Sequence, residues 1–273
     1  MKVLKFGGTS VGSPERIKSV SNLIADGQPK IVVFSAMSGT TNSLIEIADY
    51  FSRKNSEAAN NIINQLQRKY ESHVLELYSE DKTIQKSKKL LAEIFDLLRS
   101  FSNKEVGERE HKYIVAQGEI ISTNLITNYL LENGVKALLI PALDYMKLNE
   151  NEEPDMSYIK EKLSNFLNAN AGYDLYITQG FICRDYTGEV SNLQRGGSDY
   201  TACIIGAVLK SDEIQIWTDI DGMHNNDPRI VDHTSPVRQL NFEEAAELAY
   251  FGAKILHPTC IQPARYAGVP VKL

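Results

Sequence analysis

Near the start of the chain a lysine, Lys5, stands one residue before the glycine pair Gly7-Gly8. Residues 2–6 form an apolar run that predicts a β-strand, and Ser13-Pro14 is a typical beginning of a helix. A strand, a glycine turn and a helix in this order present backbone N–H groups to an anion, and the lysine could reach a bound phosphate. An ordinary tight turn beside a surface lysine has the same pattern. The chain contains neither G-x-G-x-x-G nor a glycine followed by lysine.

A second glycine turn, Gly196-Gly197, precedes Ser198-Asp199 and an apolar helix predicted for about 201–208. Two glycine turns that open helices could face one polyanion from two sides. Phosphoryl transfer requires concentrated positive charge and N–H donors, because the protein has little covalent chemistry to perform. Asp199 either takes part in such a site or caps its helix. Four cations fall in or beside the loops of this predicted fold: Lys5, Arg195, Arg229 and Lys254.

The elements that must position these side chains alternate between strands and helices. Strands are predicted at 2–6, 30–34, 136–141, 173–178, 214–218 and 269–273, and helices at 14–25, after 42, from 113, 201–208 and 242–251. A polar loop is expected at 148–157, and residues 189–193 are expected to join a hairpin. This order predicts an α/β fold, a three-layer α/β/α sandwich with a mainly parallel sheet and ligands at the carboxyl ends of the strands. Asp219, just past a strand, could hold a ribose or a metal.

Residues 53–110 differ from the rest of the chain. They contain no proline and one glycine, and their apolar residues recur at three- and four-residue steps. Such a pattern predicts two long amphipathic helices, which we expect to form an antiparallel pair inserted into the α/β fold. We expect the insertion to be a cap or packing surface without a catalytic role.

Composition excludes several classes of protein. The 273 residues carry a formal net charge of −6, which gives no reason to expect nucleic acid or an anionic membrane as partner. No apolar run approaches the length of a membrane-spanning helix, and the amino terminus lacks a signal-peptide pattern. The three cysteines have no C-x-x-C spacing, which argues for a reducing compartment and against structural zinc. We expect a cytoplasmic protein.

Seven segments resemble motifs of the aspartokinases, members of the amino-acid-kinase fold family. They are KFGGTSV (5–11), SAMSGTTN (35–42), QGEIIST (117–123), QGF (179–181), RGGSDYTA (195–202), WTDIDGMHNNDPR (217–229) and FGAKILHP (251–258). They follow the family's order and cover nearly all of the chain outside the helical insertion. The form WTDIDG, mainly through Asp221, is similar to the aspartokinase portion of bifunctional aspartokinase–homoserine dehydrogenases.

The resemblance implies aspartate kinase activity, the phosphorylation of the β-carboxylate of L-aspartate by Mg-ATP. This is the first step of lysine, threonine and methionine biosynthesis. By similarity, Lys5 stabilises the transferring phosphoryl group and Asp199 positions that lysine. No general base is needed, because an aspartate side chain is already ionised at neutral pH. The expected acceptor-binding residues are Ser35, Thr41, Glu119, Arg195 and Ser198.

Chemistry agrees with parts of this assignment. Arg195 can hold an α-carboxylate through two parallel contacts, and Glu119 suits an α-ammonium, although Glu119 could equally be a helix-surface acid. Phe181 is expected to be either a pocket wall or a core residue. The expected nucleotide-binding residues include His224, which stands where the family often has tyrosine; the others are Lys5, Gly7, Gly8, Gly196, Gly197, Thr218, Asp219, Arg229 and Lys254. No protein side chain is expected to form a metal site of its own.

Family members continue past this point into regulatory domains. We therefore expect residues 1–273 to be the catalytic domain, the regulatory domains expected after residue 273 to be absent, and the full-length protein to be a homo-oligomer, most simply a dimer. Two alternatives stay open. Another acceptor could replace aspartate: glutamate, acetylglutamate, carbamate or a nucleotide. A non-catalytic nucleotide-binding subunit could also keep this fold. Glu119 with Arg195 favours a free α-amino acid, and Lys5 with Asp199 favours a working enzyme.

Overall fold

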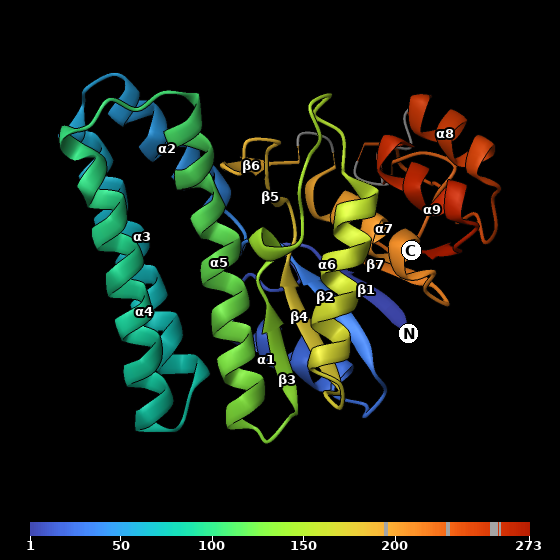
Figure 1. The fold of residues 1–273 in the computed structure, drawn as a ribbon, viewed down its shortest axis with the longest axis horizontal. Helices are drawn as coiled ribbons and strands as arrows, with labels where there is room; N and C mark the ends of the chain where they lie inside the picture. The colour runs from blue at the N-terminus through green and yellow to red at the C-terminus, as the bar shows by residue number, and fades with distance from the viewer. Residues whose placement is uncertain (194–195, 228–229, 252–255, 257) are drawn as a thin grey trace.

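The computed structural model describes residues 1–193, 196–227, 230–251, 256 and 258–273. Within these ranges one sheet contains six parallel strands in the order β3-β4-β2-β1-β7-β8 (Figure 1). The strands are β1 (Lys2–Phe6), β2 (Lys30–Phe34), β3 (Ala137–Ile140), β4 (Leu175–Gln179), β7 (Ile214–Trp217) and β8 (Val271–Lys272). Parallel strands carry their carboxyl ends to the same edge of the sheet, so the loops after β1, β2, β4 and β7 meet there.

Helices cover both faces of this sheet, which confirms the predicted three-layer architecture. One apolar core joins the sheet to α1 (Pro14–Ile24), α2 (Thr40–Ser52) and α5 (Glu108–Glu132). The other core joins it to α6 (Met156–Ala169), α7 (Gly197–Leu209) and α9 (Gln262–Ala267). Neighbouring residues of a strand point to opposite faces, so Leu4 lies in the first core and Val3 in the second.

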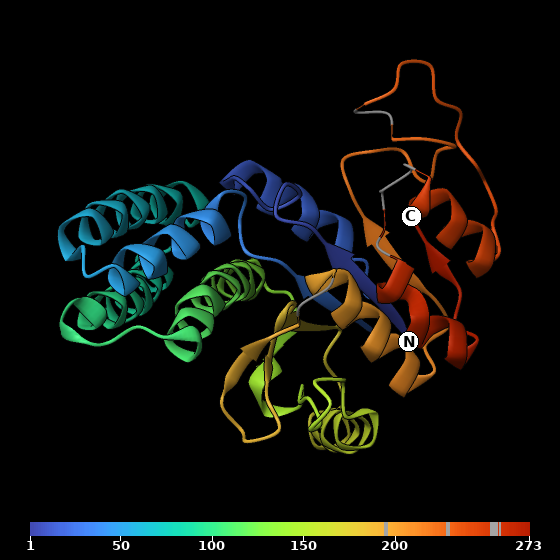
Figure 2. The same cartoon turned by 90° about the horizontal axis from the view of Figure 1, so that it is seen from above.

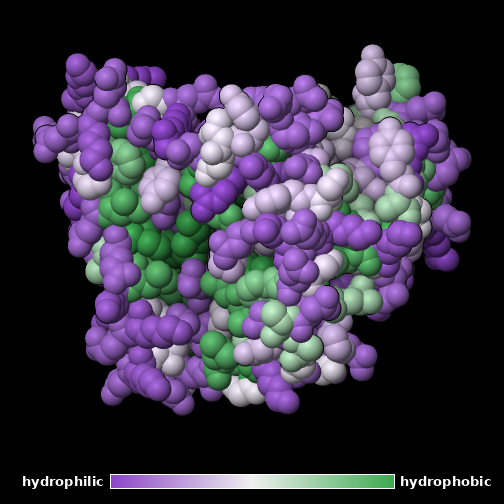
Figure 3. Space-filling model, viewed as in Figure 1, coloured by the Kyte–Doolittle hydropathy of each residue, from purple (hydrophilic) through white to green (hydrophobic). Residues whose placement is uncertain are grey.

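The predicted insertion is present as two long helices, α3 (Ser56–Leu77) and α4 (Asp81–Arg99), followed by the short 3-10 helix η1 (Ser100–Asn103). The apolar stripes expected from the sequence are buried, and their residues belong to the first core. Figure 1 shows the pair beside α2 and α5, and Figure 2 shows it at the opposite end of the molecule from α8 (Phe242–Tyr250) and α9. In Figure 3 apolar surface is visible over the insertion and α5, within a largely polar exterior.

Several boundaries differ from the prediction. Helix α5 begins at Glu108, five residues earlier than expected, because Gly107 and Glu110 form a capping arrangement there. Helix α7 begins at Gly197, before the expected start at about residue 201, and Gly196 is its N-cap residue. Helix α6 was not predicted, although Asp155 caps it by accepting a hydrogen bond from the Tyr158 N–H. The expected hairpin is formed by β5 (Ile182–Arg184) and β6 (Val190–Asn192), which pair antiparallel.

Two further features complete the described fold. The short 3-10 helices η2 (Ala142–Asp144) and η3 (Pro258–Ile261) follow β3 and precede α9. None of the helices in the described ranges combines the length and apolar character needed to cross a membrane.

Candidate active site

Lys5 forms an ion pair with Asp199 across the sheet-to-helix interface. The Lys5 Nζ lies 2.7 Å from the Asp199 Oδ1, and the two side chains are 12% and 19% exposed. Side chains along β1 alternate between the two faces of the sheet, so Lys5 points to the same face as Val3. Helix α7 covers that face, which places Lys5 beside Asp199. Asp199 is in the first turn of α7. A lysine fixed in this way presents a positive charge at the carboxyl edge of the sheet with little freedom to move away.

The first glycine turn packs directly against the loop after β2. A Cβ placed on Gly8 would lie 2.6 Å from the Ala36 carbonyl oxygen and 3.3 Å from the Ser38 nitrogen, so no larger residue fits without displacement. The Ser38 N–H donates to the Gly8 carbonyl at 3.1 Å. Two predicted site segments that are separated by almost thirty residues are thus held backbone to backbone.

The second glycine turn opens α7. Gly196 is the N-cap residue with a φ of 69°, and Gly197 has a φ of 46°, a left-handed conformation that glycine adopts at little cost. The start of a helix is a place where backbone N–H groups can bind an anion, although the Asp199 N–H here donates to the Gly196 carbonyl at 3.0 Å. A Cβ on Gly180 would lie 2.2 Å from the Ser198 Oγ, so the end of β4 also approaches this turn closely.

Ser35 and Ser198 join the two loops across the site. The Ser35 Oγ donates to the Ser198 Oγ at 2.8 Å, and the Ser122 hydroxyl donates to the Ser35 carbonyl at 2.9 Å. Ser122 belongs to α5, so the loop after β2 is held by both layers of helices. Sequence reasoning did not single out Ser122, although it lies in the quoted motif QGEIIST.

Glu119 lies buried on α5, only 3% exposed. Its Oε1 accepts a hydrogen bond from the Ala36 N–H at 3.1 Å, whereas its Oε2 is buried and has no hydrogen-bond partner among the residues that the structure describes. Burial raises the pKa of this carboxyl from 4.5 to about 7, despite the lowering effect of the Ala36 hydrogen bond. The residue is therefore not the helix-surface acid allowed by the sequence. An unpaired buried carboxylate oxygen is suited to a cationic ligand group.

Phe181 lies just after β4, and Thr41 lies at the start of α2. Phe181 has a φ of 67°, an unusual conformation for a non-glycine residue, and its ring lies 3.4 Å from where a Gly197 Cβ would stand. Its N–H donates to the Thr201 Oγ1 at 2.9 Å. Thr41 lies in the first turn of α2 and is half-buried. Phe181 is partly buried and packs against both apolar cores, and a place for either residue in a pocket wall stays a prediction.

The residues expected to hold a nucleotide are described only in part. Arg229 and Lys254 lie outside the described residues, as does Arg195, which was expected to bind the acceptor. Thr218 donates to Asp219 at 3.1 Å, and both line a cavity of about 400 Å³ together with Phe6 and Trp217. His224 is buried, with its Nδ1 2.8 Å from the Thr234 Oγ1 and its Nε2 2.6 Å from Asp221. Both of its ring nitrogens are therefore engaged, and its contact with a nucleotide stays a prediction.

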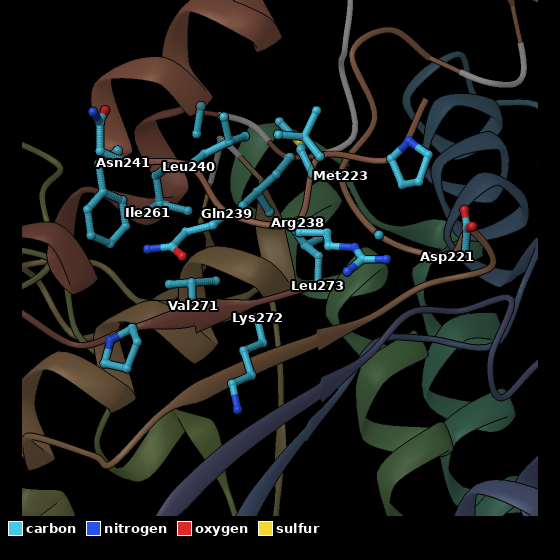
Figure 4. A pocket seen from close by; sticks show the side chains of 17 residues that line it. Asp221, Met223, Arg238, Gln239, Leu240, Asn241, Ile261, Val271, Lys272 and Leu273 are labelled. Carbon is cyan, nitrogen blue, oxygen red and sulfur yellow. The ribbon is translucent and has the colours of Figure 1, made fainter. Parts of the chain in front are cut away.

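A larger cavity, of about 670 Å³, is lined by residues of α8 and β8 among others, and Lys5 is not one of its lining residues (Figure 4). Its walls are mostly apolar, including Met223, Leu240 and Val271, with Arg238 among them. Of the expected nucleotide residues, none of those that the structure describes lines it. Within the described ranges, no group of three or more histidine, cysteine or acidic side chains is placed to hold a metal ion.

A comparison with protein families agrees with this geometry. The model described as "Amino acid kinase family" matches residues 1–273. The chain belongs to the amino acid kinase family.

Its relatives are aspartokinases. This amino acid kinase is 32% identical to lysine-sensitive aspartokinase 3 of Escherichia coli over 98% of the chain, and 36% identical to the chloroplastic aspartokinase 1 of Arabidopsis thaliana over 99%. The chain spans 60% and 49% of those two proteins. Bifunctional aspartokinase/homoserine dehydrogenases also occur among the relatives.

Solved structures give the same result. The crystal structure of Escherichia coli aspartokinase III in complex with aspartate and ADP superposes with a TM-score of 0.83 at 32% identity, covering 99% of this amino acid kinase and 61% of that chain. The expected fold and family are therefore confirmed.

Proposed function

We propose that this chain is an aspartate kinase domain that transfers the γ-phosphoryl group of ATP to the β-carboxylate of L-aspartate. A carboxylate oxygen attacks the γ-phosphorus, the bond from that phosphorus to the bridging oxygen breaks with its electron pair going to ADP, and 4-phospho-L-aspartate forms. The observation that carries the proposal is a buried oxygen of Glu119 that has no partner within the described part of the chain. The other oxygen of this carboxyl holds the loop whose Ser35 contacts Ser198. An acceptor with an ammonium group would satisfy the first of these oxygens.

Lys5 and the two glycine turns supply the phosphoryl site. The lysine ammonium would neutralise charge on the transferring group, while the backbone N–H groups near Gly8 and at the start of α7 would hold its oxygens. Asp199 keeps Lys5 in place through the 2.7 Å ion pair. The acceptor carboxylate needs no deprotonation, so Asp199 is a positioning residue rather than a base.

The amino-acid site extends from the phosphoryl site toward α5. Glu119 would bind the α-ammonium, Arg195 the α-carboxylate, and Ser35, Thr41 and Ser198 the remaining polar atoms. Binding of the ammonium would favour the ionised form of Glu119, whose pKa burial raises to about 7. This assignment is supported by contacts of the loop after β2, in which Ser35 bonds Ser198 and the Ala36 N–H bonds Glu119.

The nucleotide would occupy the carboxyl edge of β1 and β7, near Thr218 and Asp219, with Arg229, Lys254 and His224 as further contacts. A magnesium ion would accompany it, since Mg²⁺ is usually held by phosphate oxygens and water with only one or two carboxylates. Asp219, just past β7, fits that mode better than an all-protein metal site. When bound, the ion would neutralise charge on the β- and γ-phosphates.

The test is trapping of the acyl phosphate with hydroxylamine while ADP release is followed. We expect a hydroxamate with L-aspartate and ATP, and much less with glutamate, acetylglutamate or carbamate. A nucleotide monophosphate as acceptor would release ADP without hydroxamate. Equal reaction with acetylglutamate, whose nitrogen carries no charge, would contradict the role of Glu119. Nucleotide binding without any ADP release would favour a non-catalytic subunit.

The proposal extends to the assembly of the protein and to its location in the cell. We propose a homo-oligomer in the full-length protein and a cytoplasmic location. The three cysteines are buried thiols without a disulfide, as a reducing compartment would require.

A further inference from the structure

The insertion reaches the loop after β2 through the hydroxyl of Tyr70. This tyrosine lies on α3 within the apolar stripe, and its side chain is fully buried. Its hydroxyl is 2.7 Å from the Thr40 Oγ1, and Thr40 is buried as well. From the sequence Tyr70 is a core residue of an amphipathic helix, and a phenylalanine would fill that role equally well. The hydroxyl is therefore the feature that packing alone does not explain.

Thr40 occupies a sensitive place in the fold. It is the first residue of α2. The loop before it ends at Gly39, which has a left-handed conformation with a φ of 82°. Its methyl group packs toward α5, 3.4 Å from where a Gly118 Cβ would stand, while its hydroxyl contacts Tyr70 on α3. Thr40 is thus fixed between the insertion and α5. Thr41, the next residue, and Ser35, at the start of the same loop, are proposed to bind the acceptor.

A second contact from α3 supports the same loop. The Lys69 Nζ donates to the Ser38 carbonyl oxygen at 3.2 Å. From the other side, α5 holds the loop through Glu119 and Ser122, which bond the Ala36 N–H and the Ser35 carbonyl. Side chains of three helices therefore fasten the segment from Ser35 to Thr40. They come from α5, from α7 through Ser198, and from α3, which belongs to the insertion.

We infer that Tyr70 is a positioning residue for the acceptor site: through Thr40 it holds the start of α2 and the preceding loop, and so fixes Thr41 and Ser35. This inference rests on the proposed function and assigns the insertion a part in acceptor binding. Tyr70 touches neither substrate. Removing the Tyr70 hydroxyl should weaken acceptor binding and leave nucleotide binding unchanged. The nucleotide is proposed to lie on the opposite side of Lys5 from the acceptor, at the carboxyl end of β7.

The experiment compares Tyr70→Phe with Tyr78→Phe by steady-state kinetics. Tyr78 is the matched control, a buried tyrosine that caps the same helix and donates to the Leu125 carbonyl at 2.8 Å, far along α3 from the loop. A net hydrogen bond corresponds to roughly three- to tenfold in affinity, so Tyr70→Phe should raise the KM for aspartate by about that factor. The KM for ATP should stay within about twofold. Tyr78→Phe should change neither constant.

A double-mutant cycle adds a readout that a general loss of stability would not give. Thr40→Val removes the partner hydroxyl, and combining it with Tyr70→Phe should cause little further loss, because both changes delete the same contact. Thr40→Ser keeps the hydroxyl and should restore most of the aspartate affinity. Fully additive losses in the cycle would overturn the inference.

Hydrogen exchange separates failure of this inference from failure of the proposed function. The Ser43 N–H bonds to the Gly39 carbonyl at 3.1 Å, so amides at the start of α2 report on the loop without any turnover. They should exchange faster in Tyr70→Phe than in Tyr78→Phe. Unchanged exchange together with an unchanged KM for aspartate would refute the role of Tyr70. A parent protein that forms no hydroxamate would instead refute the choice of aspartate as acceptor.

Discussion

Lys5 owes its proposed role to its position on β1 more than to its charge. Lys2 lies on the same strand and carries the same charge, but it is at the amino end of the strand, where its Nζ pairs with Glu213 at 2.9 Å. Lys5 is near the carboxyl end, faces α7 and pairs with Asp199. Parallel strands place ligands at the carboxyl edge, so only the second lysine can act on a bound phosphoryl group.

We predict that Lys5→Ala lowers kcat by on the order of 10²–10³ or more, because a preorganised cation is lost from the transferring group. The matched control is Lys2→Ala, which removes the same charge from the same strand and should keep turnover within about twofold. Single-turnover rates with saturating ATP and aspartate would measure the effect. A Lys5→Ala protein that is folded by circular dichroism and turns over within a few-fold of the parent would contradict this assignment.

Glu119 gives a prediction that depends on pH. Its folded-state pKa, about 7, is above the ordinary value of 4.5, so the folded protein binds the proton more tightly than the unfolded chain does. Its favourable contribution to stability is therefore complete below pH 4.5 and is lost as the pH rises through about 7. Glu119→Gln keeps an oxygen for the Ala36 N–H and avoids the buried charge.

Without substrates, Glu119→Gln should accordingly stabilise the protein at pH 8 by on the order of 1–3 kcal/mol, and the gain should vanish near pH 5. Urea unfolding at the two pH values would measure it. The half-exposed Glu110→Gln, which alters an N-terminal capping contact of the same helix, should show no such rise between pH 5 and pH 8. A Glu119→Gln gain that is equal at both pH values would mean that the parent carboxyl is not buried in its charged form.

At the scale of elements, contact between the loops after β1 and β2 assembles the site. Gly8 has no room for a side chain, since a Cβ would meet the Ala36 carbonyl at 2.6 Å. Gly107, by contrast, starts α5 with a φ of −94°, and its Cβ would meet only the end of the Glu110 side chain at 3.4 Å. Comparing alanine variants at the two positions therefore distinguishes displacement of the packed loops from the general effect of replacing a glycine.

We predict that Gly8→Ala reduces kcat at least tenfold, because the turn and the loop must move apart and misplace both Lys5 and Ser35. Gly107→Ala should leave kcat within about twofold and could stabilise the fold slightly by restricting the unfolded chain. Parallel kinetic and thermal-unfolding measurements on both variants would test this. Full activity in Gly8→Ala would show that the two loops are not required to touch.

The elements themselves were largely predictable from the sequence. The strands of apolar residues, the Ser13 cap and the two apolar stripes of the insertion are local patterns, and the structure has them at nearly the expected residues. Helix α6 was missed because its polar start at Asp155 continues an acidic loop. The Tyr70–Thr40 contact could not be predicted, because it joins residues thirty positions apart and helical periodicity reports only that Tyr70 faces inward. Burial of Glu119 likewise depends on the packing of α5 between other elements.

At the scale of the whole molecule, the proposed catalytic residues lie at the carboxyl ends of the strands, and a group of ion pairs that stabilises the sheet lies at the opposite ends. The central strand β1 carries Lys5 at its carboxyl end, between β2 and β7. At the amino ends, Glu213 just before β7 contacts two lysines, with Lys2 on β1 at 2.9 Å and Lys272 on β8 at 2.6 Å. One carboxylate thus connects three adjacent strands of the sheet. These charges lower the pKa of Glu213 to about 2.

We predict that Glu213→Gln destabilises the protein by about 1–2 kcal/mol at pH 7 without changing kcat, because it weakens two ion pairs at the edge remote from the site. A carboxyl with a lowered folded-state pKa contributes stability above its unfolded value, and that contribution is lost as the pH falls from about 4.5 toward 2. Urea unfolding should therefore give a smaller difference between variant and parent at pH 3 than at pH 7. The control is Glu108→Gln, which removes an exposed helical pair with Lys112 and should leave stability nearly unchanged at both pH values. A large loss of turnover in Glu213→Gln at unchanged stability would mean that the two ends of the strands are coupled, contrary to this prediction.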